Sequence, residues 1–163
     1  MKFEIIDKHA YEELNCNSVF DNSHNEFNRK FGKITVSCSY AKIAWSSDLL
    51  LPQFLKISNK IYSIGVDQNF AIYDFEEKRR IMFFNLMFLF YEMVEFGIYI
   101  LVATELEIVI VDIQKYKIID IIPLPDTYKK IEINVNIIKI YCLNDRFIKY
   151  QISSNNNPLA ELI

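Results

Sequence analysis

The chain has 163 residues, of which 52% are hydrophobic and 24% are charged, and its formal net charge at pH 7 is −3. This composition allows one domain with a sizeable core and excludes an intrinsically disordered chain. Because the charge balance is acidic, it disfavours nucleic-acid binding through one broad basic face, and we expect no direct nucleic-acid partner.

The N-terminal segment, residues 1–49, mixes short elements. The sequence DKHAYEELN, residues 7–15, predicts one or two helical turns, and the acidic residues here are unlike the apolar run of a secretion signal. The polar, Asn-rich residues 15–32 predict a loop. Residues 33–45 predict one long strand or a hairpin.

One loop in this segment concentrates groups that could act as a catalytic relay: Asp21, Ser23, His24 and Glu26. They lie within a few positions of one another, so no rigid scaffold would hold their geometry. The chain also lacks the G-x-S-x-G, P-loop, G-x-G-x-x-G, H-E-x-x-H and EF-hand patterns. We therefore expect no enzymatic activity.

Cysteine and histidine usage bears on redox state and metals. The three cysteines, Cys16, Cys38 and Cys142, include no C-x-x-C pair, which is typical of free thiols in a reducing, cytoplasmic setting. The two histidines and three cysteines form no zinc pattern. We expect neither a metal nor a cofactor.

Residues 50–152 contain a repeated pattern. The segments KIYSIGVDQNFAIYD, GIYILVATELEIVIVD and IIKIYCLNDRFIKYQI each contain an Ile-Tyr pair, and these pairs recur about every 40 residues. Aligning the pairs predicts two to three units with the order strand, strand, tight turn, strand, polar turn, strand. The aligned pairs are Ile61-Tyr62, Ile98-Tyr99 and Ile140-Tyr141.

The alignment extends beyond these pairs. Asp74 corresponds to Asp112, and Phe75 corresponds to Ile113, just before a polar turn. The near-continuous apolar runs IYILVA, IVIV and KIIDII are typical of strands that are buried on both faces. Sheets that stack face to face would bury their inner strands in this way.

Residues 81–103 are the most apolar stretch of the chain. Asn85, Glu92 and Glu95 interrupt it, and its longest apolar run is far short of the ~20 residues that a membrane-spanning helix needs. Each carboxylate near mid-bilayer would also cost about 3 kcal/mol. We therefore predict two adjacent buried strands here, and no membrane partner.

The pieces IYDFEEKRRIM and IVDIQKYKIID resemble the third strand, turn and fourth strand of a WD-type β-propeller blade. The resemblance covers residues 50–152, but the Trp-Asp and Gly-His pairs of the family are absent, and the second and third units differ in length. A closed propeller has at least about four blades, whereas this chain offers two full units and most of a third. The resemblance implies an all-β fold of antiparallel, blade-like sheets in an open or partial propeller, with a β-sandwich as the alternative.

We expect residues 1–163 to form a single domain. Within it, residues 1–49 are the N-terminal segment, residues 50–152 are the blade-like repeats, and residues 153–163 are a frayed C-terminal tail.

The repeat also places corresponding turns along one edge. The turn between the second and third strands carries Asp67, Glu105 and Asp145 in the three units, and Asp126 joins the same edge. Turn residues are generally polar, so the three acidic tips can arise by chance; alternatively, they form a surface that attracts a basic protein.

We expect a non-catalytic binding protein. In general style the chain resembles bacterial immunity proteins of contact-dependent growth inhibition systems, which implies a cytoplasmic protein that neutralises a basic, nuclease-type toxin. The alternative is a propeller-like scaffold subunit that is completed by strand pairing with another chain, and a stable homo-oligomer would favour it. The expected partner-binding residues are Asp67, Glu105, Glu107, Asp145, Glu92 and Glu95.

Overall fold

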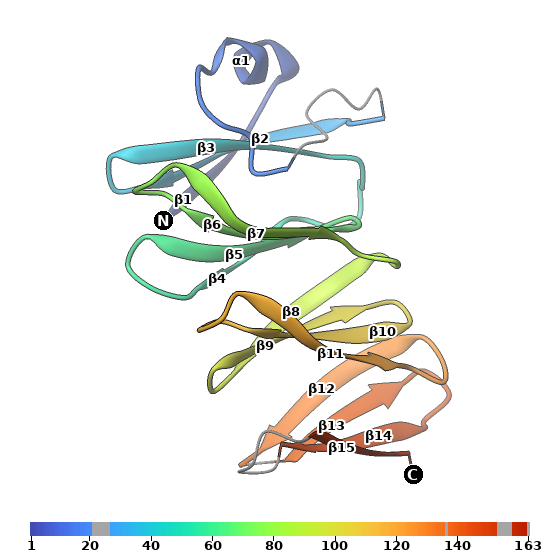
Figure 1. Ribbon diagram of the computed structural model, residues 1–163. Helices are drawn as coiled ribbons and strands as arrows, with labels where there is room; N and C mark the ends of the chain where they lie inside the picture. The colour runs from blue at the N-terminus through green and yellow to red at the C-terminus, as the bar shows by residue number, and fades with distance from the viewer. Residues whose placement is uncertain (21–26, 136, 153–157, 163) are drawn as a thin grey trace. The chain divides into compact units, whose positions relative to one another are not determined.

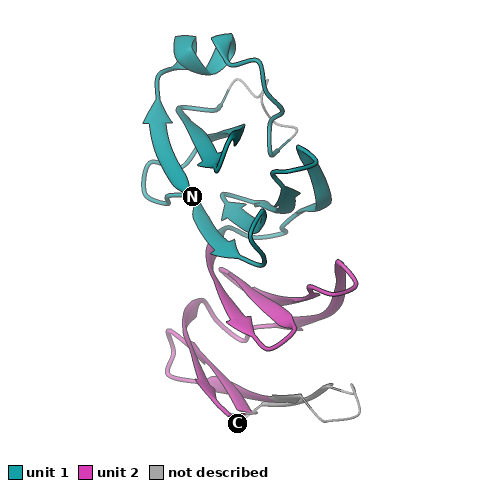
Figure 2. Cartoon of the chain, turned by 90° about the vertical axis from the view of Figure 1, so that its left-hand side faces the viewer, with its two compact units in different colours: residues 1–90 teal, residues 91–163 magenta. Residues whose placement is uncertain are grey.

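The computed structural model covers residues 1–163 and describes residues 1–20, 27–135, 137–152 and 158–162 (Figure 1). These residues form one short helix and four antiparallel sheets. The chain divides into two compact units, Met1–Phe90 and Tyr91–Ile163 (Figure 2). The predicted all-β class with blade-like antiparallel sheets is confirmed.

Unit 1 contains two sheets in which strands that follow one another along the chain are neighbours. Sheet A consists of β1 (Lys2–Ile6), β2 (Lys30–Val36) and β3 (Ser39–Trp45). Sheet B consists of β4 (Gln53–Lys56), β5 (Ile61–Val66), β6 (Asn69–Asp74) and β7 (Arg79–Asn85). The predicted strand or hairpin is therefore the β2–β3 hairpin, and the first predicted repeat unit is sheet B.

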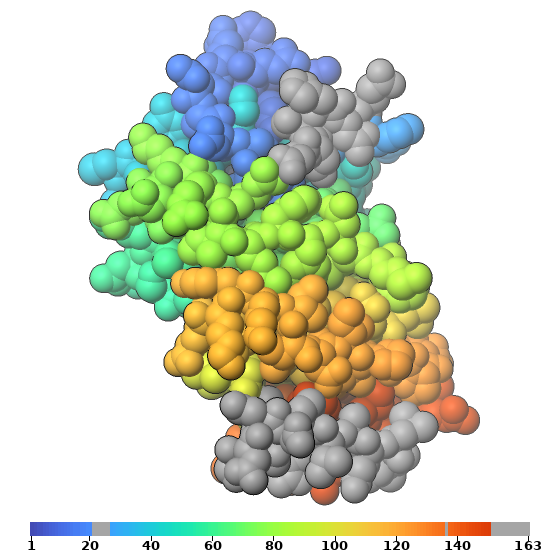
Figure 3. Space-filling view, viewed as in Figure 1, coloured from blue at the N-terminus to red at the C-terminus, as the bar shows by residue number. Residues whose placement is uncertain are grey.

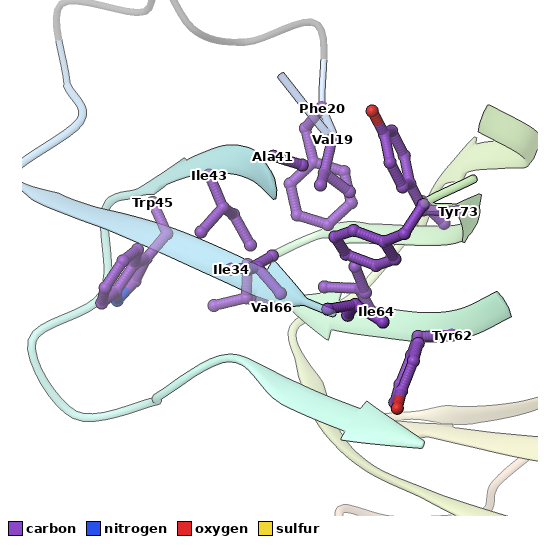
Figure 4. Packing of buried hydrophobic residues seen from close by; sticks show 13 residues of the cluster. Val19, Phe20, Ile34, Ala41, Ile43, Trp45, Tyr62, Ile64, Val66 and Tyr73 are labelled. Atoms are coloured by element: carbon purple, nitrogen blue, oxygen red, sulfur yellow. The ribbon is translucent and has the colours of Figure 1, made fainter. Parts of the chain in front are cut away.

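The core of unit 1 lies between sheets A and B (Figure 4). Side chains from β2, β3, β5 and β6 meet there, among them Ile34, Trp45, Ile64 and Tyr73. Every residue of β5 except the first is buried, as is every residue of β6 except the last. This is the burial pattern of strands with both faces covered.

Helix α1 (Lys8–Glu13) is the predicted pair of helical turns. Its N-cap Asp7 accepts a hydrogen bond from the Ala10 N–H at 2.8 Å, which satisfies one of the free donors of the first turn. Tyr11 of α1 packs on Phe31 of β2 with the ring centroids 5.0 Å apart. The helix thus covers part of the face of sheet A that is turned away from the core of unit 1.

Residues 17–19 cover the free edge of β3. The Lys42 N–H donates to the Asn17 carbonyl at 3.1 Å, and the Val19 N–H donates to the Lys42 carbonyl at 2.9 Å. Ser18 consequently pairs in parallel with Lys42. This segment comes from the β1–β2 connection and takes the position that a fourth strand occupies in the other sheets.

Unit 2 contains the other two sheets, again with consecutive strands as neighbours. Sheet C consists of β8 (Phe90–Phe96), β9 (Tyr99–Thr104), β10 (Glu107–Asp112) and β11 (Lys117–Pro123). Sheet D consists of β12 (Tyr128–Asn134), β13 (Ile137–Cys142), β14 (Phe147–Ile152) and β15 (Pro158–Leu162). Their facing side chains, including Leu101, Ile110, Ile138 and Tyr150, form the core of unit 2.

The fourth strands of sheets B and C are partly solvent-exposed. Most side chains of β7 are half-buried, and most of β11 are exposed. The space-filling view shows both strands at the surface (Figure 3). In sheets B and C the inner strands therefore supply most of the buried side chains, and the fourth strand is in contact with solvent.

The predicted correspondence of Asp74 and Asp112 is correct, and the structure gives its reason. Asp74 Oδ1 accepts the backbone N–H groups two and three residues ahead at 2.8 and 3.1 Å, and Asp112 Oδ1 accepts the equivalent pair at 2.8 and 2.9 Å. Each turn then closes through a left-handed residue, Lys78 with φ 52° and Tyr116 with φ 50°. The aspartates stabilise the turns that begin the fourth strands.

The predicted alignment of the tyrosines is wrong in register. Ile61 pairs with Asp74, and Tyr99 pairs with Asp112. Because the two aspartates are equivalent, Tyr99 corresponds to Ile61 and not to Tyr62. Neighbouring residues of a strand point to opposite faces, so a shift of one residue exchanges the faces of the whole strand.

In the third unit the shift is larger. Tyr141 is the fifth residue of β13 and pairs with Phe147 beside the β13–β14 turn. It is half-buried, whereas Tyr62 and Tyr99 are buried. The three Ile-Tyr pairs therefore reflect a shared preference for strands rather than one repeated position.

Two other expectations concern the chain ends and the apolar stretch. Residues 158–162, expected in a frayed tail, form β15, which pairs with β14 and completes sheet D as a third four-stranded sheet. Residues 81–103, predicted as two adjacent buried strands, instead contribute to three strands: β9 is buried, whereas β7 and β8 are mostly half-buried. No helix among the described residues is long and apolar enough to cross a membrane. The division into two compact units does not show whether the chain folds as one domain, so the single domain stays a prediction.

Acid should weaken the Asp112 turn. Burial pushes the Asp112 pKa upward, but the N–H groups of Lys115 and Gln114 and the Lys115 ammonium outweigh it and lower the pKa. A lowered pKa stabilises the fold above the unfolded-state pKa and loses this effect as pH falls through the folded-state value.

We therefore expect Asp112→Asn to reduce the free energy of unfolding by about 1 kcal/mol at neutral pH. The difference from the unmodified protein should shrink as the pH is lowered. Urea unfolding measured across the acid range checks this, and a difference that grows in acid would contradict it.

Candidate functional site

Hydrogen bonds gather three connections at one edge of unit 2. The Tyr128 N–H donates to the Glu105 carbonyl at 2.9 Å, which ties the start of β12 to the β9–β10 turn. The Leu143 N–H donates to the Thr127 carbonyl at 2.9 Å, which ties the β13–β14 turn to the β11–β12 connection. The side chains of these connections therefore share one edge.

Three acidic side chains lie on these connections, and we call them the unit-2 rim: Glu105, Asp126 and Asp145. Asp145 is exposed, has φ 61°, and makes an ion pair with Lys129 at 3.0 Å. Asp126 accepts the Thr127 N–H at 2.7 Å. Among the described residues, none forms a hydrogen bond or ion pair with the Glu105 carboxylate.

Glu107 is the first residue of β10 and lies just beyond the same turn. Its backbone is tied into the turn, because the Glu107 N–H donates to Thr104 Oγ1 at 3.1 Å and the Thr104 hydroxyl donates to the Glu107 carbonyl at 2.9 Å. The structure thus brings Glu105, Glu107 and Asp145 of the predicted set to one edge, together with Asp126.

Asp67 serves a different purpose in unit 1. Its carboxylate accepts the Ser46 N–H at 2.6 Å and the Ser47 N–H at 3.1 Å, and its backbone is left-handed with φ 52°. It is half-buried and fixes the connection between β3 and β4. Its charge is therefore already used by the fold.

Glu92 and Glu95 lie in β8 but in different surroundings. The Tyr128 hydroxyl donates a hydrogen bond to the Glu92 carboxylate, and burial together with this carboxylate raises the pKa of Tyr128. Glu95 is exposed and precedes the β8–β9 turn, at the edge of sheet C opposite to Glu105. Neither carboxylate joins the unit-2 rim. The Glu92–Tyr128 contact has no sequence signal, because its members are far apart in the chain.

The remaining chemical candidates add no site. Asp21, Ser23, His24 and Glu26 lie outside the described residues. Within the described part of the chain, no group of three or more His, Cys, Asp or Glu side chains could hold a metal ion. The cysteines are free: Cys142 is buried, Cys16 is half-buried and Cys38 is exposed.

Comparisons with known proteins bear on the fold. No protein-family model matches the sequence, and no curated protein matches it. Among solved structures, the β-propeller domain of Cps50 (Swd1) from Myceliophteria thermophila superposes with a TM-score of 0.51 at 15% identity, over 64% of this chain and 34% of that chain. The fold is that of β-propeller blades.

Two further structures are similar to the same degree. Sqt1 from Saccharomyces cerevisiae matches with a TM-score of 0.51 and 9% identity, over 85% of this chain and 46% of that one. Apo AztD from Citrobacter koseri matches with a TM-score of 0.51 and 12% identity, over 82% and 41%. The chain thus spans less than half the length of these proteins. None of the three likenesses bears on the toxin-immunity prediction, which stays a prediction.

Proposed function

We propose that the protein is a non-catalytic binding module of propeller blades and that it docks a protein partner on the unit-2 rim. The observation that carries this proposal is the hydrogen bonding that gathers Glu105, Asp126 and Asp145 at one edge. In blade folds the strands are used for packing, so the connections at the edges are available for recognition.

The fold favours a scaffold role, and it favours docking at the rim over strand pairing at sheet A. Residues 17–19 already pair with the free edge of β3, so this edge offers another chain little backbone to bind. The turns of the unit-2 rim, by contrast, present side chains to solvent. A partner would therefore recognise the charged side chains at this edge.

The acidic side chains of the rim favour a partner with a basic surface. Glu105 and Asp126 are half-buried and Asp145 is exposed, and Lys129 is paired with Asp145. Lys and Arg side chains on a partner complement such a surface and speed its association, and the effect falls as salt screens the charges. A basic, nuclease-type toxin is one such partner, so the immunity hypothesis would use the same rim.

Charge reversal at the rim tests this proposal. We expect Glu105→Lys combined with Asp145→Lys to weaken binding of the purified natural partner at least about tenfold at low salt, because like charges then face each other. Calorimetric titration at low and high salt measures the change.

Glu76→Lys combined with Glu77→Lys is the matched control. These exposed carboxylates lie on the β6–β7 turn of unit 1, and the charge change is identical. Equal affinity for both double variants would refute the rim proposal. If the partner is a toxin whose activity this protein inhibits, the immunity hypothesis gains support; binding without inhibition favours the scaffold role.

A further inference from the structure

Sheet D differs from sheet C in how its strands are buried. In sheet C, β9 is buried at every position and β10 at every position but the first. In sheet D, β13 alternates between half-buried and buried residues from Ile137 to Cys142. Alternation with a period of two indicates a sheet with one face on the core and the other towards water.

One face of sheet D carries lysines and aromatic rings, all half-buried except the exposed Lys130. We call it the end face, and it comprises Lys130, Glu132, Lys139, Tyr141, Phe147 and Lys149. Directly opposite one another in the register lie Tyr141 with Phe147, and Lys139 with Lys149. Two like charges in directly opposed positions weaken a sheet, so this arrangement is not explained by strand stability.

Lysines cover the aromatic rings of the end face. The Tyr141 and Phe147 centroids are 5.6 Å apart. Lys130 Nζ lies 4.9 Å from the centroid of Tyr141, and Lys139 Nζ lies 5.8 Å from that of Phe147. In such contacts the aliphatic stem shields the ring while the ammonium remains in water. The rings are therefore not bare surfaces on which an apolar side chain or a base could stack.

Glu132 contacts two other residues of the end face. It makes an ion pair with Lys130 and accepts the Tyr141 hydroxyl at 3.0 Å. An apolar face packed against this network would have to remove ion pairs and lysines from water, and this desolvation opposes the contact.

Sheet A in unit 1 also has lysines that lie over aromatic rings. Its face turned away from the core carries α1, and Lys42 Nζ lies 4.8 Å from the ring centroid of Tyr11. On the same face Lys33 Nζ lies 4.9 Å from the ring centroid of Tyr40. Sheets A and D thus each have one face on which lysines lie over aromatic rings.

Beyond the proposed function, we infer that the end face of sheet D keeps copies of this protein from stacking on one another. Two copies that meet through this face bring Lys139 and Lys149 of one against the same lysines of the other. A symmetric contact of this kind presents the same surface on both sides, so a face with three lysines and one glutamate meets another face with the same excess of positive charge. Without the lysines, the rings of Tyr141 and Phe147 would form an exposed apolar patch that favours self-association.

Removing the cover tests this inference. We expect Lys139→Thr combined with Lys149→Thr to self-associate, with a dimer dissociation constant at least about tenfold below that of the unmodified protein. Threonine suits a strand, and light scattering over a concentration series measures the association. Lys56→Thr combined with Lys117→Thr is the matched control, because both lysines are exposed, lie in strands and carry the same charge. Equal association of both double variants, or of neither, would overturn the inference.

A second pair of variants does not depend on exposing the rings. Lys139→Glu combined with Lys149→Glu should stay monomeric alone, yet associate with the unmodified protein at low salt, because the two end faces then carry opposite charges. Circular dichroism verifies that the variant is folded. A mixture that remains monomeric at low salt would contradict the inference.

Discussion

Gly65→Val is expected to lower the free energy of unfolding by about 3 kcal/mol. A Cβ atom at this position would lie 2.4 Å from Cε2 of the Phe90 ring, and Phe90 is itself 1% exposed. The ring therefore has no free space into which it can move. Valine is a good strand former, so the loss reports overpacking and not strand preference. Urea unfolding followed by circular dichroism measures it.

Two further variants assign that loss to the contact. Phe90→Ala in the Gly65→Val background should recover part of the lost free energy, because the shorter side chain leaves room. Gly97→Ala is the control for losing a glycine: nothing lies within 4 Å of its added Cβ, and its φ of 61° costs an alanine about 1 kcal/mol. A Gly65→Val loss no greater than that of Gly97→Ala would contradict the packing argument.

Trp45→Ala should destabilise the protein by about 4 kcal/mol, the usual range for a fully buried large aromatic. Trp45 is 0% exposed, and its ring centroid lies 6.1 Å from that of Phe3. The truncation leaves a cavity in the core of unit 1. Because Trp45 is the single tryptophan of the chain, unfolding has to be followed by circular dichroism rather than fluorescence.

Trp45→Phe separates ring packing from hydrogen bonding. Trp45 Nε1 is buried and has no hydrogen-bond partner among the described residues, so phenylalanine gives up no hydrogen bond there. We expect less than half of the loss seen with alanine. An equal loss for the two substitutions would contradict the packing argument, because a phenyl ring fills much more of the site than the methyl group of alanine does.

The strand pattern was predictable because it depends on local chemistry. Asp74 and Asp112 stand before polar turns, and each caps its turn through backbone N–H groups within three residues. The apolar runs IYILVA and IVIV predicted the buried strands β9 and β10 correctly, since burial on both faces leaves few polar positions. The run KIIDII misled, because β11 is an outer strand whose side chains are mostly exposed. These signals lie within a few residues of one another and need no knowledge of the tertiary fold.

Register and surface charge were harder to predict. The tyrosine alignment was shifted by one residue between Tyr62 and Tyr99, because a strand preference does not identify which residue opposes which. Asp67 looked equivalent to Glu105, and the turns do correspond, but its carboxylate is bound by the Ser46 and Ser47 N–H groups from another connection. Such long-range hydrogen bonds decide whether a turn carboxylate is available to a partner, and a repeat pattern does not reveal them.

The end face was missed although its signal is in the sequence. The segments IIKIYC and FIKY alternate lysine or aromatic residues with apolar ones, unlike IVIV in β10. Treating all units as equivalent hid this difference. Comparing the alternation of each unit, instead of aligning the units, would have singled out sheet D.

The segment beside β3 has a consequence for how unit 1 assembles. Sheet B grows from hairpins, so its contacts join residues close in the chain, and contacts of this kind form early. Sheet A instead needs β1 to meet β2 across the whole intervening connection, from which residues 17–19 must also return to β3. Closing that loop costs entropy before any contact compensates it. The slow step in folding unit 1 should therefore be the arrival of its N-terminal strand.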